Sequence, residues 1–323
     1  SIVMVNILYC FDENYNKQAA TSISSLSNKI DEKINIYIIH KNPISFKEIK
    51  SKLENLNFIN SINIYKFNDN NYEFPNLSGS HVSSATYFRL FIENYLPAGI
   101  KFITYIDADV VCINNPINEI NRTIKQMKKE NYFIAGRVEG TKEISKDYFD
   151  NLGFKGKKYF NAGVVVIDYQ KWIDSNMKNE LLEIMKEKYD QIIYWDQDVL
   201  NSYYNGEFLE LEDKLNYNFD LDNFSEELHD FVEREVCFLH YSGNGKPWNF
   251  DSVRKQNSIF YQDAFYRFFN IRYHTEIKLK KYDFIKLLRL FFNKKNKNSI
   301  PLTLFCKNLF ILFRKLVNYY IKS

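Results

Sequence analysis

The sequence predicts an α/β fold whose central sheet is mostly parallel and carries helices on both faces. In its first half, short apolar segments alternate with longer segments whose apolar residues recur at helical spacing. Strands that alternate with helices are typical of sheets of this kind. The 323 residues, 45% hydrophobic and 26% charged, are enough to bury a sizeable core in one large domain or two modest ones.

The first half predicts four strands and three helices. The strands are short apolar runs such as "INIYIIH", whereas the third helix has Ser83 as a candidate N-cap and Pro97 as its stop. The strands are predicted at 2–10, 34–40, 61–67 and 102–106, and the helices at 15–28, 45–55 and 83–96.

After residue 110 the alternation is less regular. The segments "YFIAGRVE" (132–139) and "YFNAGVVVID" (159–168) read as strands, and residues 169–189 as one long helix. A short helix is predicted at 196–204, and 235–248 reads as a strand that breaks into a Gly-rich loop.

The four cysteines are scattered and form no C-x-x-C pair, which predicts buried free thiols in a reducing compartment, the cytoplasm. The N-terminal segment reads as a strand and lacks the basic region and small-residue cleavage site of a signal peptide.

The charge is distributed unevenly along the chain. From His274 onward there are twelve Lys and Arg residues and two acidic ones, so residues 274–323 carry +10 and residues 1–273 carry −7. Residues 282–293 and 304–322 predict amphipathic helices, and neither apolar run reaches the roughly 18 residues that span a bilayer. We expect a catalytic domain over 1–273 and a membrane-association region over 274–323 that lies on anionic lipid.

The basic region also has two alternative interpretations. Nucleic acids attract basic tails, but the many Phe and Leu residues favour lipid, so no nucleic acid partner is expected. Alternatively, these helices pack on the catalytic domain or on a second subunit.

Carboxylates follow two of the predicted parallel strands. Asp12 comes just after the first strand, and Asp107 and Asp109 follow the strand 102–106. Ligands bind at the carboxyl ends of strands in open α/β sheets, and two carboxylates can bind Mn²⁺ or Mg²⁺ while leaving sites for phosphate oxygens. The alternative is a pair of solvated aspartates that cap the next helix.

Three further features each have a chemical and a structural interpretation. His240 is an acceptable Mn²⁺ ligand or an ordinary histidine at a strand end. The segment "GNGK", with Gly243 and Lys246, either approaches a phosphate or forms a simple turn. Arg89, inside an apolar helix, needs an acidic or phosphate partner.

The segment "YWDQDVLN" places Asp196 and Asp198 on either side of Gln197 at a helix start. Carboxylates there interact favourably with the helix dipole, so helix capping explains part of the pattern. Core packing is the default interpretation of "YFNAGVVVID", which contains Asn161.

The order of these features is more specific than any one of them. The chain contains, in sequence, "FDENY", "HVSSATYFRL", "YIDADVV", "YFNAG", "YWDQDVLN" and "HYSGNGKPW". This series resembles the family 8 glycosyltransferases, most closely the lipooligosaccharide α-galactosyltransferases and their glucosyltransferase relatives. The resemblance covers roughly residues 3–250.

The resemblance implies a GT-A fold with a single mixed, mostly parallel twisted sheet. It also implies retaining transfer of a hexose, galactose or glucose, from a UDP-sugar to a glycan. By the match of motifs, Asp107, Asp109 and His240 would hold Mn²⁺, with Mg²⁺ as a possible substitute, and Lys246 would meet the diphosphate. The uridine would lie near Cys10, Asp12, Asn14 and Tyr15.

The donor sugar would be held by Arg89, Asn161, Asp196 and Gln197, the last beneath the anomeric carbon. An amide is a poor nucleophile, so we expect a front-face reaction through an oxocarbenium-like state, with Gln197 as electrostatic support and Asp198 as the alternative for covalent catalysis.

Glu139 aligns with an acceptor-facing aspartate of the family. The implied acceptor is a lipid-linked bacterial surface saccharide, and the implied location is the inner face of the cytoplasmic membrane. The competing functions are a UDP-sugar hydrolase and a catalytically silent glycan- or nucleotide-binding module.

Overall fold

The computed structural model describes residues 4–69, 71–78, 82–139 and 146–276, together with the single residues 306, 310 and 314. Its strands are β1 (Asn6–Phe11), β2 (Ile34–His40), β3 (Ile59–Lys66), β4 (Phe102–Ile106), β5 (Val110–Cys112), β6 (Ile134–Val138), β7 (Phe160–Asp168), β8 (Leu209–Glu210), β9 (Tyr217–Asn218) and β10 (Phe238–His240). Its α-helices are α1 (Asn16–Ser27), α2 (Lys47–Leu53), α3 (Ile117–Glu130), α4 (Lys146–Leu152), α5 (Tyr169–Asp174), α6 (Met177–Glu187), α7 (Trp195–Tyr204), α8 (Glu226–Glu235) and α9 (Ile259–Phe269). The 3₁₀-helices are η1 (Glu13–Tyr15), η2 (Pro43–Phe46), η3 (Ser84–Asn94), η4 (Asp213–Leu215) and η5 (Gln256–Ser258).

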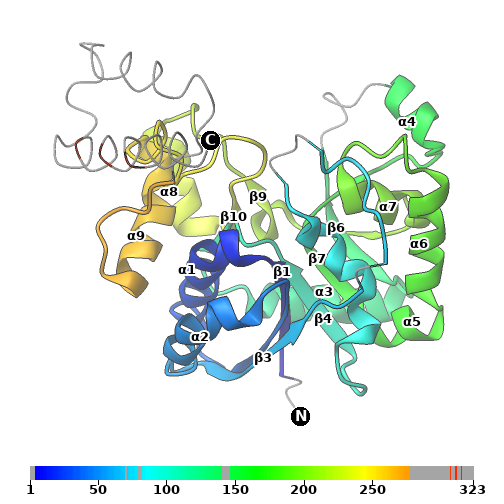
Figure 1. The fold of residues 1–323 in the computed structure, drawn as a ribbon, viewed down its shortest axis with the longest axis horizontal. Helices are drawn as coiled ribbons and strands as arrows, with labels where there is room; N and C mark the ends of the chain where they lie inside the picture. The colour runs from blue at the N-terminus through cyan, green and yellow to red at the C-terminus, as the bar shows by residue number, and fades with distance from the viewer. Residues whose placement is uncertain are drawn as a thin grey trace.

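The main sheet has seven strands in the order β3-β2-β1-β4-β7-β6-β8 (Figure 1). The pairs β2–β3, β1–β2, β1–β4 and β6–β8 are parallel, whereas β7 runs antiparallel to both β4 and β6. The predicted mixed, mostly parallel sheet is therefore confirmed. A second sheet of three strands, in the order β5-β10-β9, adds to the single sheet that the sequence predicts.

Two hydrophobic clusters cover the two faces of the main sheet. Residues of η3, α5, α6 and α7 pack on one face, and residues of α1, α2 and α3 pack on the other. Strand β1 supplies both clusters, because its alternate residues Ile7 and Leu8 point to opposite faces. Because β1 and β4 are parallel neighbours, their carboxyl ends lie side by side at one end of this sheet, which is buried on both faces.

Two predicted helices differ in the structure. Residues 84–94 form a 3₁₀-helix with non-helical dihedral angles at Phe91, although Ser83 caps it as expected by accepting from the Ala85 N–H at 3.1 Å. The predicted helix 169–189 is two helices, α5 and α6, because Asn176 adopts the left-handed conformation between them. Asn tolerates that conformation better than most residues.

The prediction of buried free thiols is confirmed for Cys10, Cys112 and Cys237 and wrong for Cys306, which is exposed.

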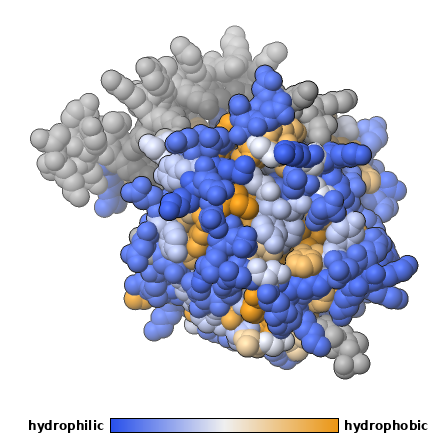
Figure 2. Space-filling view, turned by 90° about the vertical axis from the view of Figure 1, so that its right-hand side faces the viewer, coloured by the Kyte–Doolittle hydropathy of each residue, from blue (hydrophilic) through white to orange (hydrophobic). Residues whose placement is uncertain are grey.

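The basic region predicted from residue 274 lies outside the described residues, except for 274–276 and the three single positions. Within it, His274 is buried, and the Glu276 N–H donates to the Trp248 carbonyl at 2.7 Å. Among the described helices, none combines the length and hydrophobicity that a membrane crossing requires. The face drawn in Figure 2 is mainly hydrophilic, with apolar residues scattered among polar ones.

Candidate functional site

A cavity of about 440 Å³ opens at the carboxyl ends of β1 and β4. Its walls come from β1, η3, the turn between β4 and β5, β7, the start of α7 and the loop after β10. It brings together most of the residues singled out in the sequence, namely Cys10, Tyr15, Arg89, Asp107, Asp109, Glu139, Asn161, Asp196, Gln197, His240, Gly243 and Lys246.

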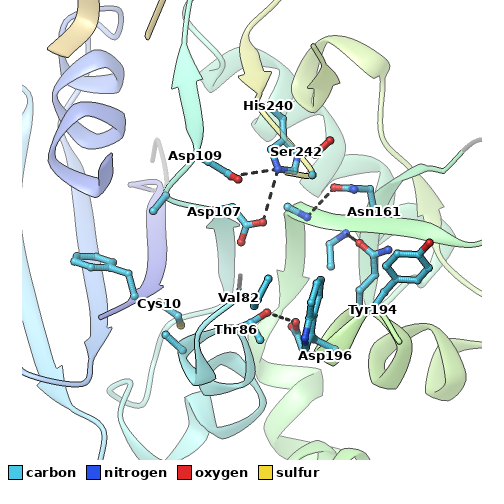
Figure 3. A pocket seen from close by; sticks show the side chains of 18 of the residues that line it. Cys10, Val82, Thr86, Asp107, Asp109, Asn161, Tyr194, Asp196, His240 and Ser242 are labelled. Atoms are coloured by element: carbon cyan, nitrogen blue, oxygen red, sulfur yellow. Dashed lines mark hydrogen bonds and ion pairs between the residues drawn. The ribbon is translucent and has the colours of Figure 1, made fainter. Parts of the chain in front are cut away.

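Asp107, Asp109 and His240 point toward one another at one end of this cavity (Figure 3). One ligand atom from each side chain lies within 4.8 Å of the other two. His240 Nε2 is 3.2 Å from Asp109 Oδ1 and 3.8 Å from Asp107 Oδ2. His240 lies more than 130 residues beyond the two aspartates in the sequence, so the fold itself assembles the cluster.

Strand register explains how the three side chains meet. In the small sheet, His240 pairs with Val110, which places it beside Asp109, and the Tyr241 N–H donates to the Asp109 carbonyl at 3.2 Å. In the main sheet, Ile106 pairs with Val164, and the Asp107 N–H donates to the Gly163 carbonyl at 2.8 Å. The main sheet therefore positions Asp107, and the small sheet positions Asp109 and His240.

The electrostatics of this cluster suit a divalent cation. Burial raises the pKa of Asp107 to about 6, with Arg89 opposing the shift and Asp109 adding to it. Burial also acts to raise the pKa of Asp109, but Lys246 and His240 outweigh it and hold that pKa below its usual range. Asp109 Oδ1 is buried and has no hydrogen-bond partner among the described residues, although it faces Nε2. Two carboxylates and one imidazole are a ligand set that Mn²⁺ and Mg²⁺ accept, so the residues fit such an ion.

Lys246 lies beside this cluster and is also buried. Its Nζ donates to Asp109 Oδ2 at 2.5 Å and to the Tyr241 carbonyl at 2.7 Å. The positive charge of Lys246 therefore lies at the same end of the cavity, where an anionic group would meet it.

Arg89 and Asp196 form a buried ion pair on the opposite wall. Thr86 also donates to Asp196, at 2.6 Å. Side chains three positions apart eclipse in a 3₁₀-helix, and this is why Thr86 and Arg89 of η3 reach the same carboxylate. The acidic partner that the sequence predicts for Arg89 is thus Asp196.

Arg89 also connects Asp196 to the cluster of carboxylates. Its guanidinium donates to the Ala162 carbonyl and lies 3.9 Å from the centre of the Tyr105 ring. The Tyr105 hydroxyl in turn donates to Asp107 Oδ1 at 2.6 Å.

Replacing Arg89 with Ala should lower the free energy of unfolding by about 3–5 kcal/mol, because it leaves the buried Asp196 carboxylate without its cation. Urea unfolding of both proteins measures this change. The matched control is Lys50→Ala, which removes an exposed pair with Glu54 and should cost at most about 1 kcal/mol. Equal losses in the two variants would contradict the importance of the buried pair.

Gln197 and Asp198 have different surroundings. Gln197 lines the cavity, accepts from the Ala162 N–H at 2.9 Å and donates to the Tyr159 hydroxyl at 3.1 Å. Asp198 is buried and is not among the lining residues that the structure describes. Its carboxylate accepts from the Tyr159 hydroxyl at 2.6 Å and from the N–H groups of residues 193 and 194 at 2.8 Å. Asp198 therefore supports Gln197 through Tyr159.

Asp12 and Asn14 also stand apart from the described lining residues. Asp12 caps η1 by accepting from the Asn14 N–H at 3.0 Å, and Asn14 is exposed. Tyr15, at the end of the same 3₁₀-helix, does line the cavity, and its ring meets Trp248 edge-on at 6.1 Å.

Several residues of the site were not predicted from the sequence. Tyr105, Tyr194, Trp195, Asn218 and Ser242 line the cavity. Tyr194 and Trp195 lie within the "YWDQDVLN" segment, which was the available signal. Tyr105 and Ser242 likewise lie within the quoted segments "YIDADVV" and "HYSGNGKPW". Asn218 had no such signal, because it reaches the site only where the small sheet forms, and there the Ser242 hydroxyl donates to its Oδ1.

Comparison with known proteins agrees with this geometry. Residues 6–252 match the family model described as glycosyl transferase family 8. A lipopolysaccharide 1,2-glucosyltransferase of Escherichia coli K12 is 29% identical over 259 residues, covering 76% of this chain and 73% of that protein. A lipopolysaccharide 1,3-galactosyltransferase of Salmonella typhimurium is 31% identical over 170 residues, covering 51% of this chain and 49% of that protein.

Solved structures show the same fold. The galactosyltransferase LgtC, in complex with donor and acceptor sugar analogs, superimposes with a TM-score of 0.69 at 20% sequence identity. The match covers 86% of this chain and 99% of the other. The glycosyltransferase GlyE of Streptococcus pneumoniae gives a TM-score of 0.58 at 18% identity, over 86% of this chain and 66% of that one.

Proposed function

Because the chain belongs to glycosyltransferase family 8, we propose that it transfers galactose or glucose from a UDP-sugar to a glycan acceptor, with retention of the anomeric configuration. The observation that carries the proposal is the convergence of Asp107, Asp109, His240 and Lys246 at one end of the cavity. An anionic leaving group such as UDP needs cationic stabilisation at that point.

Asp107, Asp109 and His240 would hold Mn²⁺, with Mg²⁺ as the substitute. Such an ion, when bound, neutralises charge that develops on the departing diphosphate. Lys246 would add a fixed positive charge, and Gly243 would let the backbone of the 243–246 loop approach the phosphates, because its φ of 74° belongs to the left-handed region.

The rest of the cavity divides between nucleotide and sugar. Tyr15 would offer a ring face to the uracil, and Cys10 would also contact the nucleotide. Asp12 and Asn14 would bind the uridine from the turn that ends at Tyr15. Arg89, Asp196 and Asn161 also line the cavity, and they would hold the hexose. The buried ion pair fixes Arg89 and Asp196 before the donor arrives, so little ordering is required on binding.

In the proposed reaction the bond between the anomeric carbon and the β-phosphate oxygen breaks, and the acceptor hydroxyl bonds to the same face of that carbon. The acceptor proton passes to the departing phosphate oxygen. Gln197 would lie beneath the oxocarbenium-like centre, with its amide held by Ala162 and Tyr159. Covalent catalysis by Asp198 is not favoured, since its carboxylate already accepts three hydrogen bonds away from the cavity.

The acceptor we propose is a lipid-linked bacterial surface saccharide such as lipooligosaccharide, in line with the names of the relatives. Glu139 lines the cavity and lies 3.7 Å from the Arg137 guanidinium, so it would face the acceptor as a charged group held in place. Synthesis of such a glycan would place the enzyme at the inner face of the cytoplasmic membrane.

A donor panel tests this function. We expect UDP release from UDP-galactose or UDP-glucose in the presence of Mn²⁺ and a lipooligosaccharide acceptor, and none from GDP-mannose. Release that is equally fast without any acceptor would identify a UDP-sugar hydrolase. Binding of UDP with no turnover of any donor would identify a silent binding module.

The membrane proposal predicts that a chain truncated after Glu276 loses its binding to phosphatidylglycerol vesicles. The truncation begins after Glu276 because His274 and Glu276 pack on the catalytic domain, where the Gln18 amide donates to Glu276 at 2.7 Å. Turnover of a soluble acceptor should stay within about threefold of the full chain. Vesicle flotation measures the binding, with phosphatidylcholine vesicles as the control, and undiminished flotation would contradict a membrane role for residues 277–323.

A further inference from the structure

We propose that Asn216 is a positioning residue that ties the proposed metal ligand His240 to the proposed sugar-binding residue Asn161. Asn216 lies between η4 and β9 and is fully buried. Its Oδ1 is 2.8 Å from His240 Nδ1, and its Nδ2 is 2.9 Å from Asn161 Oδ1. The inference rests on the proposed function and adds to it a physical link between metal binding and recognition of the hexose.

One backbone group sets the direction of the hydrogen bonds that link the side chains of Asn161, Asn216 and His240. The Gly163 N–H donates to an Asn161 side-chain atom at 2.9 Å, and only an oxygen can accept there. The Asn216 atom that meets this oxygen must therefore be the amide nitrogen. Its other atom, the oxygen, then faces His240, so Nδ1 of the imidazole must carry a proton.

The consequence at the metal end is a fixed tautomer. When neutral, an imidazole protonated on Nδ1 has its lone pair on Nε2, and this atom faces Asp107 and Asp109. A second hydrogen bond of this kind orients histidine ligands in metal sites, and its loss typically weakens metal binding 10- to 100-fold. Asn216 thus prepares His240 to bind a cation.

The consequence at the sugar end is a fixed amide. Asn161 Oδ1 already accepts two hydrogen bonds, one from Asn216 and one from Gly163. Asn161 also lines the cavity, so the group it presents there is its Nδ2 donor. The Asn161 amide can donate a hydrogen bond to a hydroxyl oxygen of the hexose. Free UDP has no hexose, so only the UDP-hexose can accept this hydrogen bond.

Replacing Asn216 with Asp separates the two roles. A carboxylate still accepts from His240 Nδ1, but it cannot donate to Asn161 Oδ1, and the two oxygens repel each other. Asn161 must then move or turn its amide, which removes its donor from the cavity. We expect Mn²⁺ affinity within about threefold of the original protein and a roughly tenfold loss in the ratio of UDP-hexose affinity to UDP affinity.

Replacing Asn216 with Ala removes both links. We expect the same loss in the affinity ratio together with a 10- to 100-fold weaker binding of Mn²⁺. The electron paramagnetic resonance signal of free Mn²⁺ reports metal affinity on the full chain without any turnover, and calorimetry with UDP and with the UDP-hexose gives the ratio.

The matched control is Asn257→Asp. Asn257 is also fully buried, and its Oδ1 pairs with a histidine nitrogen, Nε2 of His229, at 2.8 Å, while its Nδ2 donates to backbone carbonyls. It stands outside the described lining residues of the cavity, so we expect its variant to lose stability but to keep both affinities.

The outcomes are distinguishable. If the original protein binds neither Mn²⁺ nor UDP, the proposed function fails. If it binds both, and Asn216→Asp lowers the ratio of UDP-hexose affinity to UDP affinity no more than Asn257→Asp does, then Asn216 has only a structural role and the inference is wrong.

Discussion

Replacing Asp109 with Asn should lower hexose transfer at saturating donor by at least about a hundredfold. The substitution keeps the size of the side chain and removes one of two carboxylates in a cluster that also contains His240. It also removes the negative charge that Lys246 Nζ contacts at 2.5 Å. Lys246 and the proposed Mn²⁺, the two cations expected to bind the diphosphate, therefore both lose a carboxylate partner. Electrostatic stabilisation of a developing charge is commonly worth factors of about 10²–10³ in rate.

The comparison uses the rate of UDP release, measured with Mn²⁺ in excess. Asp222→Asn is the matched control, because Asp222 is 76% exposed and pairs only with Lys255 among the described residues. Its rate should stay within about twofold of the original protein. A rate for Asp109→Asn within tenfold of the original would show that the carboxylate cluster is not where the leaving group is stabilised.

Replacing Gly163 with Ala should slow hexose transfer by a similar factor, although the substitution removes no polar atom. A Cβ at this position would lie 2.1 Å from His240 Cε1 and 2.7 Å from Nδ1. Both residues are held in strands, so the imidazole cannot turn aside without breaking its bond to Asn216. We expect at least tenfold weaker Mn²⁺ binding, at least a hundredfold slower transfer, and a stability loss of about 1–3 kcal/mol from overpacking.

Gly245→Ala separates this steric effect from a general cost of losing a glycine. Its Cβ would meet Leu221 at 3.8 Å, an ordinary contact, and its backbone needs no positive φ. Gly245 is not among the described residues that line the cavity, so this control should keep Mn²⁺ affinity within about twofold. An intact Mn²⁺ affinity in Gly163→Ala would mean that His240 is not a ligand.

Local pattern was enough to predict most of the main sheet and the ends of its strands. The alternation of strands and helices predicts β1 to β4, and Asp107 and Asp109 follow directly from a buried strand. The order of six motifs predicted the distant partner His240. The strands and the two aspartates depend on contiguous residues, whereas His240 was identified through the resemblance of the whole series of motifs to a known family.

The remaining features depend on contacts that no short segment contains. The small sheet needs β5, β9 and β10 to pair across more than 100 residues, and only this pairing brings Asn216 and Asn218 to the site. The 3₁₀ geometry of η3 suits the shared contacts of Thr86 and Arg89 with Asp196, which helical spacing alone does not indicate. Asp198 looks like part of the cavity in the sequence, yet its carboxylate turns to the N–H groups that precede α7.

The metal site is tested most sharply by transfer of radiolabelled hexose by the full chain after its metal has been stripped with EDTA. UDP-galactose and UDP-glucose are each supplied with a lipooligosaccharide acceptor, and Mn²⁺ is then titrated back. We expect no transfer before Mn²⁺ is added, saturable recovery with one of the two donors, and an α-linked product. Transfer at full rate in the stripped protein, unchanged by added Mn²⁺, would contradict the assignment of Asp107, Asp109 and His240 as a metal site for the departing UDP.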